Sequence, residues 1–331
     1  MNIIEISGLT KRFDELTAVD NVSLSVEKGE LFGLLGPNGA GKTTMINMLT
    51  TLLKPTSGTA EVAGYNIGTD SGGVRRNIGI VFQDPSLDLG LTGMENLEFH
   101  AMMYNIGSAE RKERIHELLD IVGLSDKADT LVEYYSGGMK RRLEIARGLI
   151  HRPEVLFLDE PTLGLDAQTR RKIWDYIRTL NDEYSTTIIL TTHYMEEADY
   201  LCERIAIIDN GNIAALDTPA NLKNCLKGEN VRLGVEDGHA DLITEALVKM
   251  PWVVDIESED GFVSLTITDG EENIPEIFRI AHSAGAGISS VNLHKPSLED
   301  VFIHLTGSSI REEKGDRRSA RRENRRRRMM R

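Results

Sequence analysis

The feature that most constrains the fold is a glycine-rich segment, GPNGAGKTT, at residues 36–44. It follows the short apolar run 31–35, which predicts a buried strand, and it leads into a segment from about Lys42 that predicts a helix. The pattern G-x-x-x-x-G-K-[S/T] between a strand and a helix is typical of a loop that wraps phosphate groups. A chain of this length matches it by chance in roughly one case in 100. We therefore predict a nucleotide site here.

Each residue type in this loop has a chemical role in the prediction. Glycines let backbone N–H groups turn toward phosphate oxygens, and the start of the following helix adds a partial positive charge. Lys42 is expected to reach the β- and γ-phosphates, and the Thr43 hydroxyl to coordinate Mg²⁺. The predicted nucleotide-binding residues are Gly36, Pro37, Asn38, Gly39, Ala40, Gly41, Lys42, Thr43 and Thr44.

A second motif is the apolar run VLFL at residues 155–158, which ends in Asp159 and Glu160. Such a run predicts a buried parallel strand, and ligands of open α/β sheets bind at the carboxyl ends of the strands. Asp159 suits the coordination shell of Mg²⁺, and Glu160 suits a general base for an attacking water. Many strands end in an acidic turn, so this signal gains its weight from the phosphate loop beside it.

Strands and helices alternate over residues 2–216, which predicts an α/β sheet. A third motif, Ser136-Gly137-Gly138, opens a basic helical stretch and predicts another anion site at a helix start. With these motifs in this order, residues 1–225 resemble the ATP-binding-cassette (ABC) ATPase family. The resemblance implies ATP hydrolysis with ATP and Mg²⁺. It also implies a P-loop cassette with a RecA-like core, an antiparallel β subdomain and a helical subdomain at about 86–152.

The resemblance implies further roles. Glu160, His193 and Gln83 are the expected catalytic residues, and Thr43, Gln83 and Asp159 the expected metal ligands. Phe13 stands where the family places an aromatic ring on adenine. Ser136, Gly137 and Gly138 match the signature that contacts the nucleotide of the other subunit, and Asp166 matches the D-loop. The flanks of the signature are Tyr135 and Met139, where the family usually has Leu and Gln.

The pattern changes after about residue 226. The predicted order is strand-helix-strand-strand-helix-strand, with a final helix, PSLEDVFIHLTG, and it indicates a small ferredoxin-like α+β domain over 226–307. Two interpretations stay open for this domain. It either strengthens a dimer of cassettes, or it acts as a regulatory or ligand-sensing unit.

The charge of the chain is unevenly distributed. Residues 311–331 hold 11 Lys and Arg against 4 Asp and Glu, so the net charge of −14 splits into +7 there and −21 elsewhere. We predict a disordered Arg-rich tail at 308–331. The tail is either a solvated charge run or a contact for anionic lipid head groups. Nucleic acid is disfavoured as a partner, because the acidic body repels phosphates.

Several features bear on the location and partners. There are 2 cysteines, no apolar run long enough for a membrane span, and no signal-peptide layout at the N-terminus. We therefore expect a cytoplasmic protein, peripheral on the inner face of the cell membrane. The stretch YYSGGMKRRLEIARGLI and the final helix resemble the drug-resistance (daunorubicin-efflux-like, ABC-2 exporter) branch of the family. That resemblance implies a homodimer and a separate ABC-2-type transmembrane permease. The alternative is a soluble ABC ATPase acting on nucleic acid or ribosomes.

Overall fold

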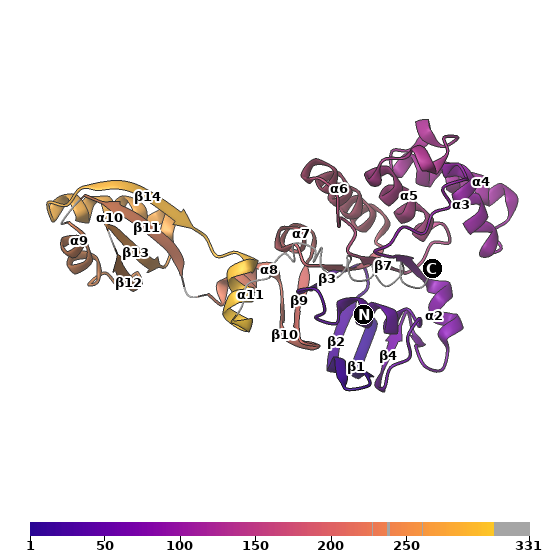
Figure 1. The fold of residues 1–331 in the computed structure, drawn as a ribbon, viewed down its shortest axis with the longest axis horizontal. Coiled ribbons are helices and arrows are strands. Elements are labelled where there is room, and N and C mark those ends of the chain that lie inside the picture. Colours follow the sequence, from indigo (N-terminus) through magenta and orange to yellow (C-terminus); the bar gives the residue numbers. More distant parts are fainter. Residues whose placement is uncertain (227, 237–238, 260, 308–331) are drawn as a thin grey trace, which may run out of the picture.

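The structure, a computed structural model, describes residues 1–226, 228–236, 239–259 and 261–307. The predicted tail at 308–331 lies outside the described residues. The described part of the chain forms three β-sheets and three hydrophobic cores. Two of the sheets belong to a large N-terminal unit, and the third stands apart from it in a smaller C-terminal unit (Figure 1).

The central sheet of the large unit has six strands in the order β10-β9-β3-β8-β7-β6. The neighbours from β9 to β6 pair in parallel, and β10 pairs antiparallel at one edge. Because the parallel strands share one direction, the loops after β3, β6, β7 and β8 emerge at the same edge. The strands are β3 (Leu31–Leu35), β6 (Ile78–Val81), β7 (Val155–Asp159), β8 (Thr187–Thr192), β9 (Arg204–Asp209) and β10 (Asn212–Asp217).

Strand β3 shows why this sheet is buried on both faces. Leu31 and Leu35 belong to the core under the helices, whereas Phe32 and Leu34 belong to the core under a second sheet. A parallel strand that is covered on both faces is expected to carry apolar side chains on both of them. The continuous apolar runs at 31–35 and 155–158 therefore correspond to central strands, as predicted.

The second sheet is antiparallel, in the order β2-β1-β4-β5, and it covers one face of the central sheet together with α1 and α2. Its strands are β1 (Asn2–Phe13), β2 (Leu16–Glu27), β4 (Ser57–Val62) and β5 (Tyr65–Asn66), and the two helices are α1 (Lys42–Leu49) and α2 (Ser71–Asn77). This is the antiparallel β subdomain that the resemblance implied.

Helices cover the other face of the central sheet. They are α3 (Gly93–Met103), α4 (Ser108–Ile121), α5 (Gly137–Leu149), α6 (Ala167–Tyr184) and α7 (Met195–Leu201), with short 3₁₀ turns at Ser125–Lys127 and Val132–Tyr134. Helices α3 to α5 form a group beside the sheet (Figure 1). Helix α3 starts at a capping box of Thr92 and Glu95, which satisfies its first N–H groups. Among the described residues, no helix has the length and hydrophobicity needed to span a bilayer.

The C-terminal unit has the element order that the sequence predicted. It consists of β11 (Glu229–Val235), α9 (Ala240–Leu247), β12 (Val253–Glu259), β13 (Phe262–Ile267), α10 (Gly270–Ser283) and β14 (Ile288–His294). All neighbours in the sheet β12-β13-β11-β14 pair antiparallel. This order, with two helices packed on one face, is that of a ferredoxin-like fold.

The last helix, α11 (Leu298–Thr306), packs away from this unit. Its buried residues Leu298, Val301 and Phe302 join the helix-side core of the large unit. There they lie with Leu222 of α8 (Pro219–Asn224), and Figure 1 shows α11 beside α8. The sequence pattern grouped this helix with residues 226–307, because an amphipathic pattern predicts a buried face without naming its partner. The C-terminal unit is thus tethered to the large unit at both ends.

Candidate functional site

A cavity of about 420 Å³ opens at the carboxyl edge of the central sheet. It collects side chains from the β1–β2 hairpin and from the loops after β3, β6 and β7. Among the residues predicted from sequence, the cavity is lined by Phe13, Asn38, Gly39, Gly41, Lys42, Thr43, Thr44, Gln83 and Glu160. Leu16, Ala18 and Leu163 complete the lining. Parallel strand direction explains why segments so distant in sequence meet here.

The phosphate loop fits between β2 of one sheet and β9 of the other because glycine occupies two positions. Gly41 has a φ of 106°, and a Cβ there would lie 2.3 Å from the carbonyl oxygen of Ala18. A Cβ on Gly36 would lie 2.2 Å from the carbonyl oxygen of Ile208. Both distances are too short for any real contact, so a side chain at either position would push the loop out of place.

Lys42 is buried within the loop, with 4% of its surface exposed. Its Nζ donates to the carbonyl oxygens of Gly36 at 2.8 Å and Pro37 at 3.0 Å, and it lies 3.4 Å from Oε1 of Glu160. Burial lowers the pKa of Lys42, although the charge of Glu160 opposes that shift. The loop thus holds a cation next to backbone N–H groups, which is the setting an anionic ligand requires.

Glu160 contacts both Lys42 and the end of the neighbouring strand, β8. Its Oε2 lies 3.1 Å from Nδ1 of His193, and its backbone N–H donates to the hydroxyl of Thr191 at 3.0 Å. Burial raises the pKa of Glu160, but the hydrogen bond with His193 and the charge of Lys42 outweigh it and lower the pKa overall. Glu160 also adopts a left-handed φ of 46°, a strained conformation that concentrates at functional sites.

Asp159 lies one residue earlier and is almost fully buried. Its Oδ1 accepts hydrogen bonds from the hydroxyls of Thr43 at 3.1 Å and Thr191 at 2.5 Å. Thr43 and Gln83 both line the cavity, and Asp159 is hydrogen-bonded to Thr43. The carboxylate, the hydroxyl and the amide are the hard oxygen donors that Mg²⁺ prefers. The residues therefore fit a magnesium ion next to the phosphate loop.

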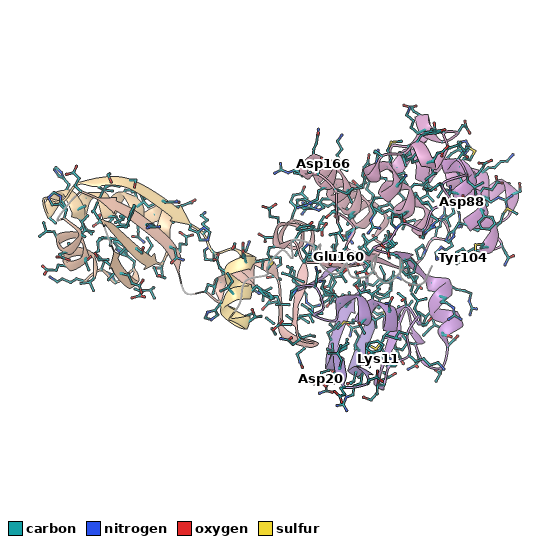
Figure 2. The ribbon with its side chains drawn as sticks, in the orientation of Figure 1. Lys11, Asp20, Asp88, Tyr104, Glu160 and Asp166 are labelled. Carbon is teal, nitrogen blue, oxygen red and sulfur yellow. The ribbon has the colours of Figure 1, made fainter. Side chains whose placement is uncertain are left out.

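The signature residues and Asp166 lie outside the cavity lining. Ser136 caps α5 by accepting a hydrogen bond from the N–H of Met139 at 3.3 Å. Asp166 caps α6 by accepting one from the N–H of Thr169 at 2.9 Å. Figure 2 shows Asp166 well apart from Glu160. Within one copy, these predicted nucleotide contacts are thus held at the starts of helices, away from the phosphate loop.

Two residues that shape the site, Thr191 and Arg141, were not predicted from the sequence. Thr191 links the backbone of Glu160 to the carboxylate of Asp159, and a threonine at a strand end gives no special signal. Arg141, in the middle of α5, donates hydrogen bonds to carbonyl groups at both ends of the site. The sequence could have marked Arg141 as buried, because this residue lies on the same helix face as the buried Gly138 and Ile145. A charged residue on an apolar face needs a specific partner.

The fold and the site geometry are those of a phosphate-loop ATPase, and comparison with known proteins specifies the family. A family model described as "ABC transporter" matches residues 19–163. A second, "ATP-binding protein DrrA1-3-like, C-terminal domain", matches residues 218–306. The chain belongs to the ABC transporter ATP-binding proteins: it is an ATPase that binds ATP. The family predicted from sequence is thereby confirmed.

Individual relatives match over nearly the whole chain. The daunorubicin/doxorubicin resistance ATP-binding protein DrrA of Streptomyces peucetius is 42% identical over 306 residues, which cover 92% of each chain. The linearmycin resistance ATP-binding protein LnrL of Bacillus subtilis (strain 168) is 37% identical over 94% of this chain and 100% of its own. Among solved structures, the dimeric post-hydrolysis cassette MJ0796 bound to ADP and Pi superposes with a TM-score of 0.59. It is 31% identical, over 65% of this chain and 98% of its own.

Proposed function

We propose that this ATPase powers export of a drug-like, lipid or other small substrate through a separate ABC-2-type membrane permease. The observation that carries the proposal is that one chain joins the phosphate loop and the Asp159-Glu160 pair to a DrrA-like C-terminal domain. Two drug-resistance ATP-binding proteins match the chain over 92% and 94% of its length, a span that takes in most of both units. A soluble ATPase acting on nucleic acid or ribosomes, the alternative from sequence, is not favoured by these relatives.

In the proposed reaction, the N–H groups of the loop 36–44 bind the phosphates of ATP. Lys42 leaves its two carbonyl partners and turns its ammonium group toward the β- and γ-phosphates. Phe13, with 43% of its surface exposed at the mouth of the cavity, stacks on adenine. Glu160, held ionised by His193 and Lys42, accepts a proton from the attacking water. His193 keeps that carboxylate in place and contacts the γ-phosphate.

Magnesium is a proposed part of this site. Thr43 and Asp159 would hold the ion, and Gln83 would complete its protein ligands from the loop after β6. When bound, the ion neutralises charge on the β- and γ-phosphate oxygens. The Thr43–Asp159 hydrogen bond supports this assignment, because it brings two oxygen donors to one side of the loop.

We propose that the working unit is a homodimer with two composite sites. Cassettes of this family dimerise, as the structure of MJ0796 illustrates. Ser136, Gly137 and Gly138 lie away from the phosphate loop of their own copy, which leaves them for the γ-phosphate held by a second copy. Asp166, near the same surface, would then lie at the junction between the two copies.

We further propose that residues 1–225 form the cassette and that 226–307 form an accessory domain that strengthens the dimer, with its last helix, α11, anchored in the cassette core. We also propose that the protein works on the inner face of the cell membrane. Residues 311–331, with a charge of +7, would contact anionic lipid head groups. Sedimentation with phosphatidylglycerol vesicles at low salt tests this contact. Protein without residues 308–331 should bind less, and equal binding by both proteins would refute a lipid role for the tail.

The permease is best sought by trapping the ATP-bound state. Glu160→Gln removes the proposed base but keeps the shape of the side chain, so ATP should stay bound and uncleaved. A tagged variant is purified from detergent-solubilised native membranes with ATP and Mg²⁺, and Lys42→Ala serves as the control that binds ATP poorly. We expect a polytopic membrane protein in a fixed ratio to the bait. Ribosomes, DNA or a soluble partner without any membrane protein would contradict the proposed function.

A further inference from the structure

The guanidinium group of Arg141 joins helix α5 to two segments of the site, the end of β6 at Phe82 and the end of β7 at residues 159–161. Only 7% of its surface is exposed. Its Nη2 donates to the carbonyl oxygens of Asp159 at 2.9 Å and Glu160 at 3.1 Å, and its Nε donates to that of Pro161 at 2.7 Å. Its Nη1 donates to the carbonyl oxygen of Phe82 at 2.5 Å. One planar group thus holds three consecutive carbonyls around Glu160 and the residue before Gln83.

Two further side chains on the same face of α5 extend this contact along the loop after β6. Glu144 lies 3.2 Å from Nη1 of Arg141, and its Oε1 accepts a hydrogen bond from the N–H of Ser86 at 2.8 Å. Arg147 donates to the carbonyl oxygen of Ser86 at 2.6 Å and to its hydroxyl. Positions 141, 144 and 147 recur at three-residue spacing, so they share one helix face. This face holds the segment 82–86 against α5.

These contacts are costly to break. Hydrogen bonds from a charged donor are about twice as strong as neutral ones, and a buried carbonyl that loses its donor keeps its full desolvation penalty. Lysine cannot replace this arginine, because a single ammonium group lacks the planar fork that reaches four oxygens at once. Helix α5 and the backbone at 82–86 and 159–161 are therefore expected to move as one body.

The signature residues lie at the start of the same helix, one turn before Arg141. We propose that Arg141 is a positioning residue for hydrolysis, which sets Glu160 and Gln83 according to the docking of Ser136–Gly138 on a second copy. This inference rests on the proposed function, since it takes Glu160 as the base and the signature as a dimer contact. Docking of the signature of one copy on the nucleotide of its partner would then shift the position of Glu160 in that same copy. The two ATP sites are thereby coupled through a single side chain in each copy.

The test compares Arg141→Lys with Arg142→Lys in the full-length protein. Arg142 is a matched control on the same helix, because its Nη1 donates to the carbonyls of Val122 and Gly123 and to the Tyr176 hydroxyl, away from both segments. For Arg141→Lys we expect kcat to fall about 10- to 100-fold, with KM for ATP changed less than about threefold. The control should keep the wild-type kcat. Binding of a fluorescent ATP analogue counts the folded sites, so that kcat is given per site.

A wild-type kcat per site for Arg141→Lys would overturn the inference, and so would equal losses in both variants. Where Arg141→Lys does not fold, Arg147→Gln takes its place, since both hydrogen bonds of Arg147 are made with Ser86. That variant should lower kcat about two- to fivefold at unchanged KM, and an unchanged kcat would overturn the inference. Glu160→Gln distinguishes a failure of the proposed function from a failure of the role of Arg141 alone. If it hydrolyses ATP at the wild-type rate, the proposed function fails; if it is inactive while Arg141→Lys is fully active, only the role of Arg141 fails.

Discussion

The attachment of the C-terminal unit through helix α11 leads to a quantitative prediction for Phe302→Ala. Phe302 is 2% exposed and packs with Leu298, Val301 and Leu222 in the core of the cassette. Truncation of a buried phenylalanine costs about 3–5 kcal/mol. The loss cannot exceed the free energy that docks the helix, and three buried side chains at about 1.5–3 kcal/mol each set that limit. That limit is about 4.5–9 kcal/mol and does not reduce the cost of truncation. We therefore expect the cassette to lose about 3–5 kcal/mol, a large part of the roughly 5–15 kcal/mol of an ordinary domain.

The two tryptophans allow each unit to be followed separately. Trp174 lies in the core of the cassette and Trp252 packs against the core of the C-terminal unit. Urea unfolding is followed by fluorescence in a Trp252→Phe background, which leaves Trp174 as the reporter. Phe302→Ala should lower the midpoint of the Trp174 transition. Phe278→Ala, at a phenylalanine that is 44% exposed on α10, is the control and should cost less than about 0.5 kcal/mol. Equal midpoints for the wild type and Phe302→Ala would refute the docking of α11 on the cassette.

Three shorter predictions concern the site and its pH dependence. Gly36→Ala places a Cβ 2.2 Å from the carbonyl oxygen of Ile208, so calorimetry should find ATP affinity at least about tenfold weaker; unchanged affinity would contradict the tight fit of the loop. His193→Ala removes the hydrogen bond that holds Glu160, so kcat should fall about 10- to 100-fold with little change in ATP affinity, and an unaltered kcat in steady-state assays would exclude this role. Burial, reinforced by neighbouring cations, lowers the pKa of His100 from 6.5 to about 4. The unfolded chain then binds more protons between these values, so stability is highest above pH 6.5 and falls as the pH drops toward 4. Urea titrations at pH 7 and 5 should show this loss, and His100→Gln should reduce it; a variant with the same pH slope as the wild type would argue against His100 as the cause.

Much of the candidate site could be predicted from sequence because its residues follow buried parallel strands. Lys42 follows β3, Gln83 follows β6, and Asp159 ends β7. A parallel sheet brings such positions to one edge whatever their distance in the chain. The ferredoxin-like order of the C-terminal unit was predictable for a related reason, since alternating and helical periodicities differ clearly over 229–294.

The contacts that the sequence did not predict involve groups without a pattern. Arg141 binds carbonyl oxygens, and every residue carries one, so nothing in the letters at 82 or 159–161 marks them as acceptors. The partner of α11 was hidden because an apolar helix face fits any apolar surface. The resting contacts of Lys42 with Gly36 and Pro37 depend on loop geometry that the motif alone does not specify.

The measurement that tests the central claim most directly is the mass of the Glu160→Gln protein in solution, with and without ATP and Mg²⁺. We predict a change from monomer to dimer on adding nucleotide, with one ATP bound per chain. Gly137→Ala, added to the same background, supplies the control. A Cβ there would lie 3.5 Å from Cδ2 of Leu165, an ordinary contact within one copy. In the proposed dimer it would face the phosphate bound by the other copy. That double variant should bind ATP and stay monomeric. A protein that binds ATP without dimerising, or a dimer indifferent to Gly137→Ala, would contradict an ATP site completed by the signature of a second copy.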